Sequence, residues 1–353
     1  MGPPTLLRKR LLAWYRENAR KDLPWRKTRN PYRIWVSETM LQQTQVATVI
    51  PYYGRFLKKF PTLKALAEAP LSRVLDGWSG LGYYSRAKNL HAAARQILKE
   101  HRGRVPDQVQ DLLRLPGVGR YTAGAVASIA YDRPAPVLDG NVTRVLTRIL
   151  GIRQDPKGPA VQSRLWETAQ RLVPDESAGT FNQALMELGA LVCLPRNPRC
   201  SACPASYDCV ARENGWQQEI PLRGDPPTRK RIRYLCGILE RNGSVLLARR
   251  PFSGLLPGLW EFPGGEKQPG ESDSEGLSRS LKERLGIRVE PQAFRSSVEQ
   301  TLTHRELQIR AFDCRFNGGS IHPRWYLETR WAPRKDLEKM ALTAGMRKLV
   351  QQL

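Results

Sequence analysis

The chain has 353 residues, which exceeds the size at which a single hydrophobic core usually stops growing, so two domains are expected. Lysine and arginine outnumber aspartate and glutamate by 57 to 33, and the resulting charge of +24 indicates a polyanionic partner, either nucleic acid or an anionic membrane. No apolar run is long enough to span a membrane, and the N-terminus lacks a signal-peptide pattern, so we expect a soluble intracellular protein bound to DNA or RNA.

Residues 6 to about 212 are predicted to be mostly helical, because apolar residues recur there at spacings of three and four. The expected helical segments are Leu6–Tyr15, Ile34–Ile50, Leu63–Leu75, Ala87–Ile97, Thr122–Ala130, Val142–Leu150, Ser163–Leu172 and Phe181–Val192. A basic, proline-rich stretch at residues 213–233 follows and is predicted to be a linker. We therefore expect a helical domain over residues 1–212 and a second domain over residues 234–353.

Beyond the linker the apolar period shifts towards two, which is typical of strands. Strands are expected at Tyr234–Glu240 and Ser244–Arg250, joined across Asn242-Gly243, a strong hairpin signal. One helix is expected near Ser274–Leu285, where leucines share one face. The predicted fold class is thus a multi-domain protein with an all-α domain followed by an α/β domain.

The most informative segment begins with LPGVGRYTAG at residues 115–124. Gly117 and Gly119 flank one small apolar residue, which suggests a hairpin too tight for a Cβ at either end. A helix is expected to begin at about Arg120, and its free N–H groups would bind a phosphate. A carboxylate, Asp139, follows about twenty residues later. A phosphate site beside one acid favours an enzyme of nucleic-acid chemistry over a plain helical corner.

Four of the six cysteines lie within seventeen residues in the spacing C-x6-C-x2-C-x5-C. Four thiolates on one compact loop suit an iron–sulfur cluster, whereas structural zinc more often takes two separated C-x-x-C pairs. Iron–sulfur is favoured on spacing, zinc stays the alternative, and disulfides are not expected in a reducing compartment. The four candidate ligands are Cys193, Cys200, Cys203 and Cys209.

The hairpin, the aspartate and the cysteine loop, in this order, resemble the helix-hairpin-helix base-excision glycosylases related to endonuclease III. The resemblance covers residues 6–212 and implies that the four cysteines hold one [4Fe–4S] cluster. Endonuclease III-like lyases carry a lysine at the position of Tyr121. The amine of that lysine attacks the sugar. The neighbouring Arg120 stays protonated and cannot replace it. The resemblance therefore implies a monofunctional enzyme that uses water.

The segment around Glu38, WVSETMLQQTQV, is similar to the adenine DNA glycosylase family almost residue for residue. On its residues alone Glu38 could be a solvated glutamate near a helix start. The resemblance implies instead that Glu38 is the catalytic acid, which protonates adenine and favours a pKa raised by burial. Asp139 would stay ionised and stabilise the cationic sugar, electrostatically or through a transient covalent bond.

The same resemblance implies further roles for residues that the pattern alone leaves unremarkable. Asn141 and Tyr121 would orient Asp139, and Arg26 and Gln183 would line the adenine pocket. Gln43 and Tyr83 would wedge into the duplex beside the flipped base, although from the residues alone Gln43 would be a surface residue and Tyr83 a core residue. Gly117 and Gly119 would be the phosphate-binding positions.

The second half contains an altered Nudix signature, with its frame at Gly265, Glu271 and Arg279. Two of the three clustered glutamates of that signature are replaced, by Ser280 and Arg284, so magnesium binding is not expected. The resemblance implies a Nudix-like domain that has lost hydrolysis and instead recognises 8-oxoguanine. The expected recognition residues are Thr303 and His304, preceded by Leu302 where the family has phenylalanine, so stacking there is expected to be weaker.

These features predict a monomeric bacterial protein of the cytoplasm whose partner is double-stranded DNA with 8-oxoguanine:A or G:A mispairs. Three other functions stay open at this point. They are a bifunctional lyase for oxidised pyrimidines, a nucleotide pyrophosphohydrolase with a DNA-tethering arm, and a DNA-binding iron–sulfur protein without catalysis.

Overall fold

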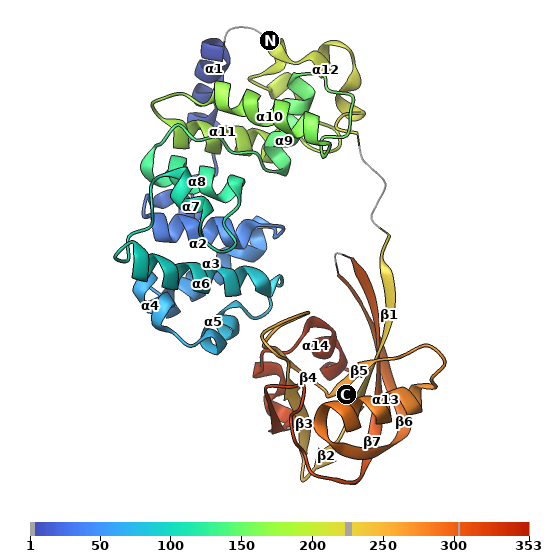
Figure 1. Ribbon diagram of the computed structural model, residues 1–353. Coiled ribbons are helices and arrows are strands. Elements are labelled where there is room, and N and C mark those ends of the chain that lie inside the picture. The colour runs from blue at the N-terminus through green and yellow to red at the C-terminus, as the bar shows by residue number, and fades with distance from the viewer. Residues whose placement is uncertain (1–3, 223–227, 303, 353) are drawn as a thin grey trace. The chain divides into compact units, whose positions relative to one another are not determined.

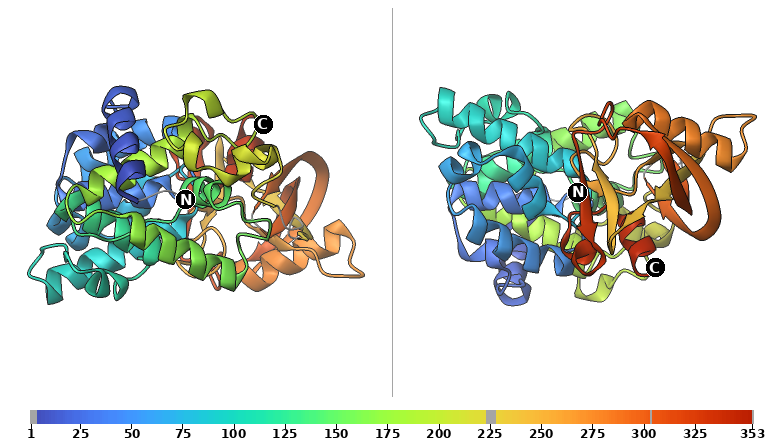
Figure 2. Two further views of the ribbon diagram at one scale, coloured as in Figure 1. Left: turned by 90° about the horizontal axis from the view of Figure 1, so that it is seen from above. Right: turned by 90° about the horizontal axis from the view of Figure 1, so that it is seen from below.

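A computed structural model of the chain describes residues 4–222, 228–302 and 304–352. The chain divides into two compact units, Met1–Ala69 with Lys88–Asp225 and Pro70–Ala87 with Pro226–Leu353 (Figure 1). Among the described residues, strands occur only in the second unit, within residues 230–333, which are drawn from yellow to red in both views of Figure 2. No described helix combines the length and the apolar character needed to cross a bilayer.

The first unit is helical, as the spacing of apolar residues predicts. Its core is formed where α9, α10 and α11 pack together with α1, through side chains such as Leu11, Leu146, Leu165 and Phe181, none of which is exposed. Its helices are α1 (Pro4–Asn18), α2 (Pro31–Leu41), α3 (Val46–Lys59), α4 (Leu63–Glu68), α6 (Tyr84–Glu100, which begins in the second unit), α7 (Val109–Leu113), α8 (Arg120–Tyr131), α9 (Gly140–Ile149), α10 (Pro159–Leu172), α11 (Ala178–Leu191) and α12 (Val210–Glu213).

Two helices that the sequence predicts as continuous are each broken in the structure. The segment Ile34–Ile50 divides into α2 and α3, because Gln43 adopts a left-handed backbone conformation with φ 55°. The segment Leu63–Leu75 divides into α4 and α5 (Leu71–Trp78) at Ala69, which is extended. The residue before a proline avoids the helical region, so Pro70 explains the second break.

The second unit contains two sheets. One has the strand order β5-β1-β7-β6, in which β1 and β7 run parallel and the other pairs are antiparallel. In the other, β3 pairs with β2, β4 and β8. The elements are β1 (Lys230–Ile238), β2 (Glu240–Arg241), β3 (Ser244–Arg249), β4 (Trp260–Glu261), β5 (Gly264–Glu266), α13 (Asp273–Leu285), β6 (Ile287–Thr301), β7 (Arg305–Gly319), β8 (Glu328–Pro333) and α14 (Ala344–Val350).

Strand β1 is covered on both faces. Cys236 and Ile238 belong to the cluster that contains Met346 of α14, whereas Leu235 belongs to the cluster that contains Leu281 of α13. Side chains alternate between the faces of a strand, so this division follows from the sequence. The predicted strands, the hairpin at Asn242-Gly243 and the helix near Ser274–Leu285 are all confirmed.

Candidate active site

Glu38 lies in α2, a helix buried over most of its length, and only 5% of its surface is exposed. Burial disfavours the charged carboxylate and raises the pKa of Glu38 to about 7. The negative charge of Asp139 contributes to the rise, whereas a hydrogen bond from Tyr121 and the charge of Arg26 oppose it. The interpretation of Glu38 as a solvated glutamate is therefore wrong. It is a buried acid that can hold a proton near neutral pH.

Tyr121 projects from the first turn of α8, which packs along α2. Its hydroxyl donates a hydrogen bond to Glu38 Oε2 over 2.6 Å and lies 3.4 Å from the sulfur of Met186. Burial raises the pKa of Tyr121 well above its usual value, so the hydroxyl keeps its proton and acts as a donor. The resemblance implies that Tyr121 orients Asp139, but the hydroxyl donates to Glu38, because α8 faces α2 at this point.

Asp139 is the N-cap of α9. Its carboxylate accepts hydrogen bonds from the Val142 backbone N–H at 2.7 Å and from Asn141 Nδ2 at 2.9 Å, so the expected orienting role of Asn141 agrees with the structure. Burial raises the pKa of Asp139, and these two hydrogen bonds oppose the rise. A carboxylate at a helix N-terminus also benefits from the helix dipole. Asp139 and Glu38 thus differ in environment: Asp139 caps a helix and accepts two hydrogen bonds there, whereas Glu38 is more deeply buried and accepts one from Tyr121.

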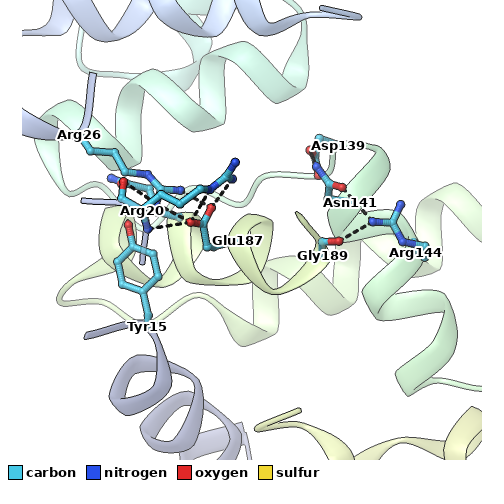
Figure 3. Close-up of polar contacts among 9 residues, drawn as sticks. Tyr15, Arg20, Arg26, Asp139, Asn141, Arg144, Glu187 and Gly189 are labelled. Atoms are coloured by element: carbon cyan, nitrogen blue, oxygen red, sulfur yellow. Dashed lines mark hydrogen bonds and ion pairs between the residues drawn. The ribbon is translucent and has the colours of Figure 1, made fainter. Parts of the chain in front are cut away.

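Arg144 links Asn141, the hydrogen-bond partner of Asp139, to the cysteine loop. Its Nη2 donates to Asn141 Oδ1 at 2.9 Å and to the Gly189 carbonyl oxygen at 2.7 Å (Figure 3), and its Nε donates to the Cys193 carbonyl oxygen at 2.7 Å. The approach of α9 to α11 depends on Gly189, since a Cβ there would lie 2.6 Å from Asn141 Cβ. The sequence did not identify Arg144, because its partners are up to 49 residues away.

Arg26, one of the two predicted adenine-pocket residues, forms part of a buried ion cluster. Glu187 of α11 is fully buried and binds the guanidinium groups of both Arg20 and Arg26 (Figure 3). Burial opposes ionisation of Glu187, but the hydrogen bonds from the two arginines prevail and lower its pKa to about 2. Sequence reasoning missed Glu187; the available signal was one acid inside the apolar helix that carries Gln183.

The other predicted pocket residue, Gln183, lies one turn before Glu187 in α11 and is half-buried. Its Oε1 accepts a hydrogen bond of 3.0 Å from the hydroxyl of Tyr15, and the Arg26 guanidinium lies 5.5 Å from the centre of the Tyr15 ring. Arg26 is also close enough to Glu38 for its charge to lower that pKa. The structure thus connects both predicted pocket residues to each other through Tyr15, and Arg26 to the buried acid.

The two predicted wedge residues share an unusual backbone. Gln43 and Tyr83 both have left-handed φ angles, 55° and 48°, which non-glycine residues seldom adopt. Both side chains are exposed, so the assignment of Tyr83 to the core from its residue type is wrong. Strained, exposed positions of this kind are concentrated at functional sites.

The two glycines of the predicted phosphate site differ. Gly117 has φ 73° and a Cβ there would lie 2.5 Å from Asn89 Cβ, so the hairpin requires glycine. Gly119 is the N-cap of α8 with φ −88°, and a Cβ there would meet nothing within 4 Å. The expectation that neither position has room for a Cβ is therefore wrong for Gly119. Helix α8 begins at Arg120, as predicted.

The four cysteines of the loop are half-buried, are not disulfide-bonded and line one small cavity. Burial raises the pKa of Cys203 to about 12, and the other three thiols add to the rise, which shows that the four groups lie close together. The buried guanidinium of Arg148 donates to Cys193 Sγ at 3.2 Å. In the part of the chain that the structure describes, no three acidic, thiol or imidazole side chains converge on a single ion position.

The Nudix frame of the second unit is occupied by protein contacts. Arg279 binds the carboxylates of Glu271 and Glu283. Ser280 is buried, and the Arg284 guanidinium lies 4.1 Å from the centre of the Trp325 ring. The glutamates that remain in the signature are therefore paired with arginine.

Of the predicted lesion-recognition residues, Thr303 lies outside the described residues. His304 is exposed immediately before β7. Leu302 packs against the core of the second unit, and its N–H donates to the Arg305 carbonyl oxygen at 2.7 Å. Leu302 therefore has a packing role in the hairpin.

The arrangement in the first unit suits acid-assisted cleavage of a bond to a sugar. A protonated buried acid can donate to a leaving group, while a second, helix-capping carboxylate stabilises positive charge on the sugar. Tyr121 cannot act as an amine nucleophile.

Residues 36–171 match the HhH-GPD superfamily of base excision DNA repair proteins, and residues 234–352 match the NUDIX domain. The adenine DNA glycosylase of Rattus norvegicus is 37% identical over 400 residues, which span 98% of this chain and 77% of that protein.

Two solved structures each cover about 60% of this chain. A thermostable thymine-DNA glycosylase is 32% identical with a TM-score of 0.54, over 60% of this chain and 97% of that protein. A non-covalent complex of endonuclease III with DNA is 24% identical with a TM-score of 0.51, over 61% of this chain and 99% of that protein, and shows the fold alone. The predicted fold class, a helical glycosylase domain followed by a Nudix-like α/β domain, is confirmed.

Proposed function

The chain belongs to the adenine DNA glycosylase family, and from that relationship we propose that it excises adenine mispaired with 8-oxoguanine or guanine in DNA. The observation that carries the proposal is the environment of Glu38: buried, bonded to the Tyr121 hydroxyl, and with a pKa of about 7. A general acid is most effective when its pKa lies near the working pH.

The reaction breaks the bond between C1′ of the sugar and N9 of adenine. Glu38 donates its proton to N7, so the electron pair of the breaking bond leaves with a neutral base instead of an anion. The Asp139 carboxylate, fixed by Asn141 and the N-terminus of α9, stabilises the positive charge on the sugar. Water then adds to C1′ and returns a proton to Glu38. The products are free adenine and an abasic site.

The proposed enzyme is monofunctional. A lyase needs an amine that can attack C1′, and position 121 carries the Tyr121 hydroxyl instead. The adjacent Arg120 guanidinium lies 4.1 Å from the centre of the Trp166 ring and offers no amine. Arg26 and Gln183 are proposed to line the adenine pocket, and Gln43 and Tyr83 to enter the duplex.

We assign the cysteine cavity to one [4Fe–4S] cluster held by Cys193, Cys200, Cys203 and Cys209. The donor set fits, since four free thiols line one cavity and a buried arginine donates to one of them. When bound, the cluster would supply a rigid anchor for the loop that Arg144 contacts.

The second domain, proposed over residues 234–353 after a linker at 213–233, would recognise 8-oxoguanine through Thr303 and His304. Hydrolysis of nucleotides is not proposed. Arg279 forms ion pairs with Glu271 and Glu283, the glutamates that remain in the Nudix signature, and Ser280 and Arg284 replace the other two. The charge of +24 favours DNA, and the chain is proposed to act as a monomer in the bacterial cytoplasm.

Single-turnover excision on 8-oxoguanine:A, G:A and T:A duplexes tests the proposal, with the full chain and with a chain that ends before residue 234. We expect adenine release from the first two duplexes, and loss of the preference for 8-oxoguanine in the shortened chain. Equal rates on T:A would contradict the proposed mispair specificity. Efficient capture on DNA by borohydride would contradict the monofunctional mechanism.

A further inference from the structure

The orientation of the Gln183 amide is set by residues that the proposed mechanism does not use. Gln183 and Glu187 are one turn apart in α11, and Met186 between them contacts the Tyr121 hydroxyl that binds Glu38. This face of α11 therefore borders the proposed site of the extruded adenine. The inference rests on the proposed function for the location of the base.

Glu187 anchors the outer part of this arrangement. Arg26 donates Nη1 to Glu187 Oε1 at 2.9 Å and Nη2 to Oε2 at 2.7 Å, which fixes the plane of its guanidinium. Arg20 binds the same carboxylate through its backbone N–H at 3.0 Å and its Nε at 2.9 Å, so Glu187 has little freedom to turn. Bidentate pairs of this kind combine strength with a defined geometry. Arg26 is consequently held against the ring of Tyr15 (Figure 3).

Tyr15 in turn fixes the orientation of the Gln183 side chain. Its hydroxyl donates to Gln183 Oε1 at 3.0 Å. Burial raises the pKa of Tyr15, so the hydroxyl stays protonated over the working range of the enzyme. An amide has an oxygen that only accepts and an NH2 group that only donates. The bond fixes which end of the amide faces Tyr15, so the NH2 group, which Tyr15 does not contact, is available to the base.

We propose that Tyr15, held by Arg26 and Glu187, determines base specificity by orienting Gln183 so that its NH2 group donates to an acceptor nitrogen of the extruded adenine. Glu38 takes N7 in the proposed reaction, which leaves the ring nitrogens N1 and N3 as acceptors. Tyr15 and Glu187 are positioning residues in this scheme, because they act through Gln183 and Arg26.

Atomic substitution in the base provides the test. Single-turnover excision is measured with the full chain on duplexes that carry adenine, 1-deazaadenine or 3-deazaadenine opposite 8-oxoguanine. Each analogue also changes the intrinsic reactivity of the base, so the comparison is the ratio of analogue to adenine rates in each variant. Tyr15→Phe removes the hydroxyl and keeps the ring under Arg26. The matched control is Tyr131→Phe, which removes another half-buried hydroxyl whose partner is the Val105 backbone oxygen.

The wild type is expected to lose about tenfold in rate with one of the two analogues, the typical effect of one neutral hydrogen bond. In Tyr15→Phe the adenine rate falls and this penalty shrinks to about twofold, because the amide is no longer held in one orientation. Tyr131→Phe keeps the wild-type penalty. Glu187→Gln, which loosens Arg26, is expected to reduce the penalty in part, with thermal unfolding used to confirm that the variant is folded.

An unchanged penalty in Tyr15→Phe, or no difference between the two analogues in the wild type, would overturn the inference while adenine release stays intact. A wild-type chain that releases no adenine from the unmodified duplex would overturn the proposed function instead. A structural role for Tyr15 alone would lower all three rates by one factor and leave the ratios unchanged, which also overturns the inference.

Discussion

Replacement of Tyr121 by phenylalanine tests how the pKa of Glu38 is controlled. The hydroxyl donates to Glu38 Oε2 at 2.6 Å and stabilises the ionised carboxylate. It therefore opposes the rise in pKa that burial causes, and the pKa of Glu38 with this bond in place is about 7. A hydrogen bond to a charged group contributes about 1.5–3 kcal/mol, and 1.36 kcal/mol corresponds to one pKa unit. Tyr121→Phe should therefore raise the pKa of Glu38 by about one to two units, to about 8–9.

In the proposed mechanism Glu38 acts in its protonated form, so the rate should fall as pH rises through its pKa. The alkaline limb of the single-turnover profile should therefore move to higher pH in Tyr121→Phe, whatever happens to the maximal rate. Tyr32→Phe is the control, since Tyr32 lies in the same helix but its hydroxyl donates to the Phe60 carbonyl oxygen at 2.8 Å. An alkaline limb that stays in place, or moves to lower pH, would refute the assignment of this hydrogen bond to the ionised form of Glu38.

Further predictions concern stability and the links between elements. The folded-state pKa of Glu38, about 7, exceeds its ordinary value of 4.5, so ionisation of this carboxyl weakens the fold. Glu38→Gln should therefore be more stable than the wild type by about 3 kcal/mol in denaturant titrations at pH 8, and this gain should disappear below pH 4.5. Gly117→Ala should destabilise the fold by about 1–3 kcal/mol, whereas Gly119→Ala should change the free energy of unfolding by less than about 0.5 kcal/mol; equal losses would contradict this account. Arg144→Ala should slow adenine release at least about tenfold and lower the melting temperature, because Asn141 loses its partner; unchanged excision would show that Asp139 needs no such support.

The helical segments of the first unit could be predicted because apolar periodicity is a local property. The break at Gln43 could not, since its left-handed backbone has no signature in a glutamine. Pro70 did signal a break, but the leucines on either side suggested continuity. In the second unit the alternation along β1 and the Asn242-Gly243 turn gave the strands, whereas the parallel pairing of β1 with β7 depends on contacts about 75 residues apart.

In the candidate site, too, some residues could be predicted from local motifs and others depend on distant contacts. Glu38 and Asp139 were predictable from motifs, and the structure adds their contrasting environments. Glu187 was not, because a carboxylate in an apolar helix becomes informative only when its arginine partners, more than 160 residues away, are known. The sequence does not show which helix α8 faces, so it does not reveal that the Tyr121 hydroxyl donates to Glu38.

Adenine release by Glu38→Gln on an 8-oxoguanine:A duplex, measured under single-turnover conditions with duplex binding in parallel, decides whether Glu38 is the catalytic acid. Glutamine keeps the size of the side chain but cannot donate the acidic proton. We predict binding close to that of the wild type and a rate reduced at least about a hundredfold, the lower range for loss of a general acid. Adenine release at the wild-type rate would contradict the assignment of Glu38 as the catalytic acid.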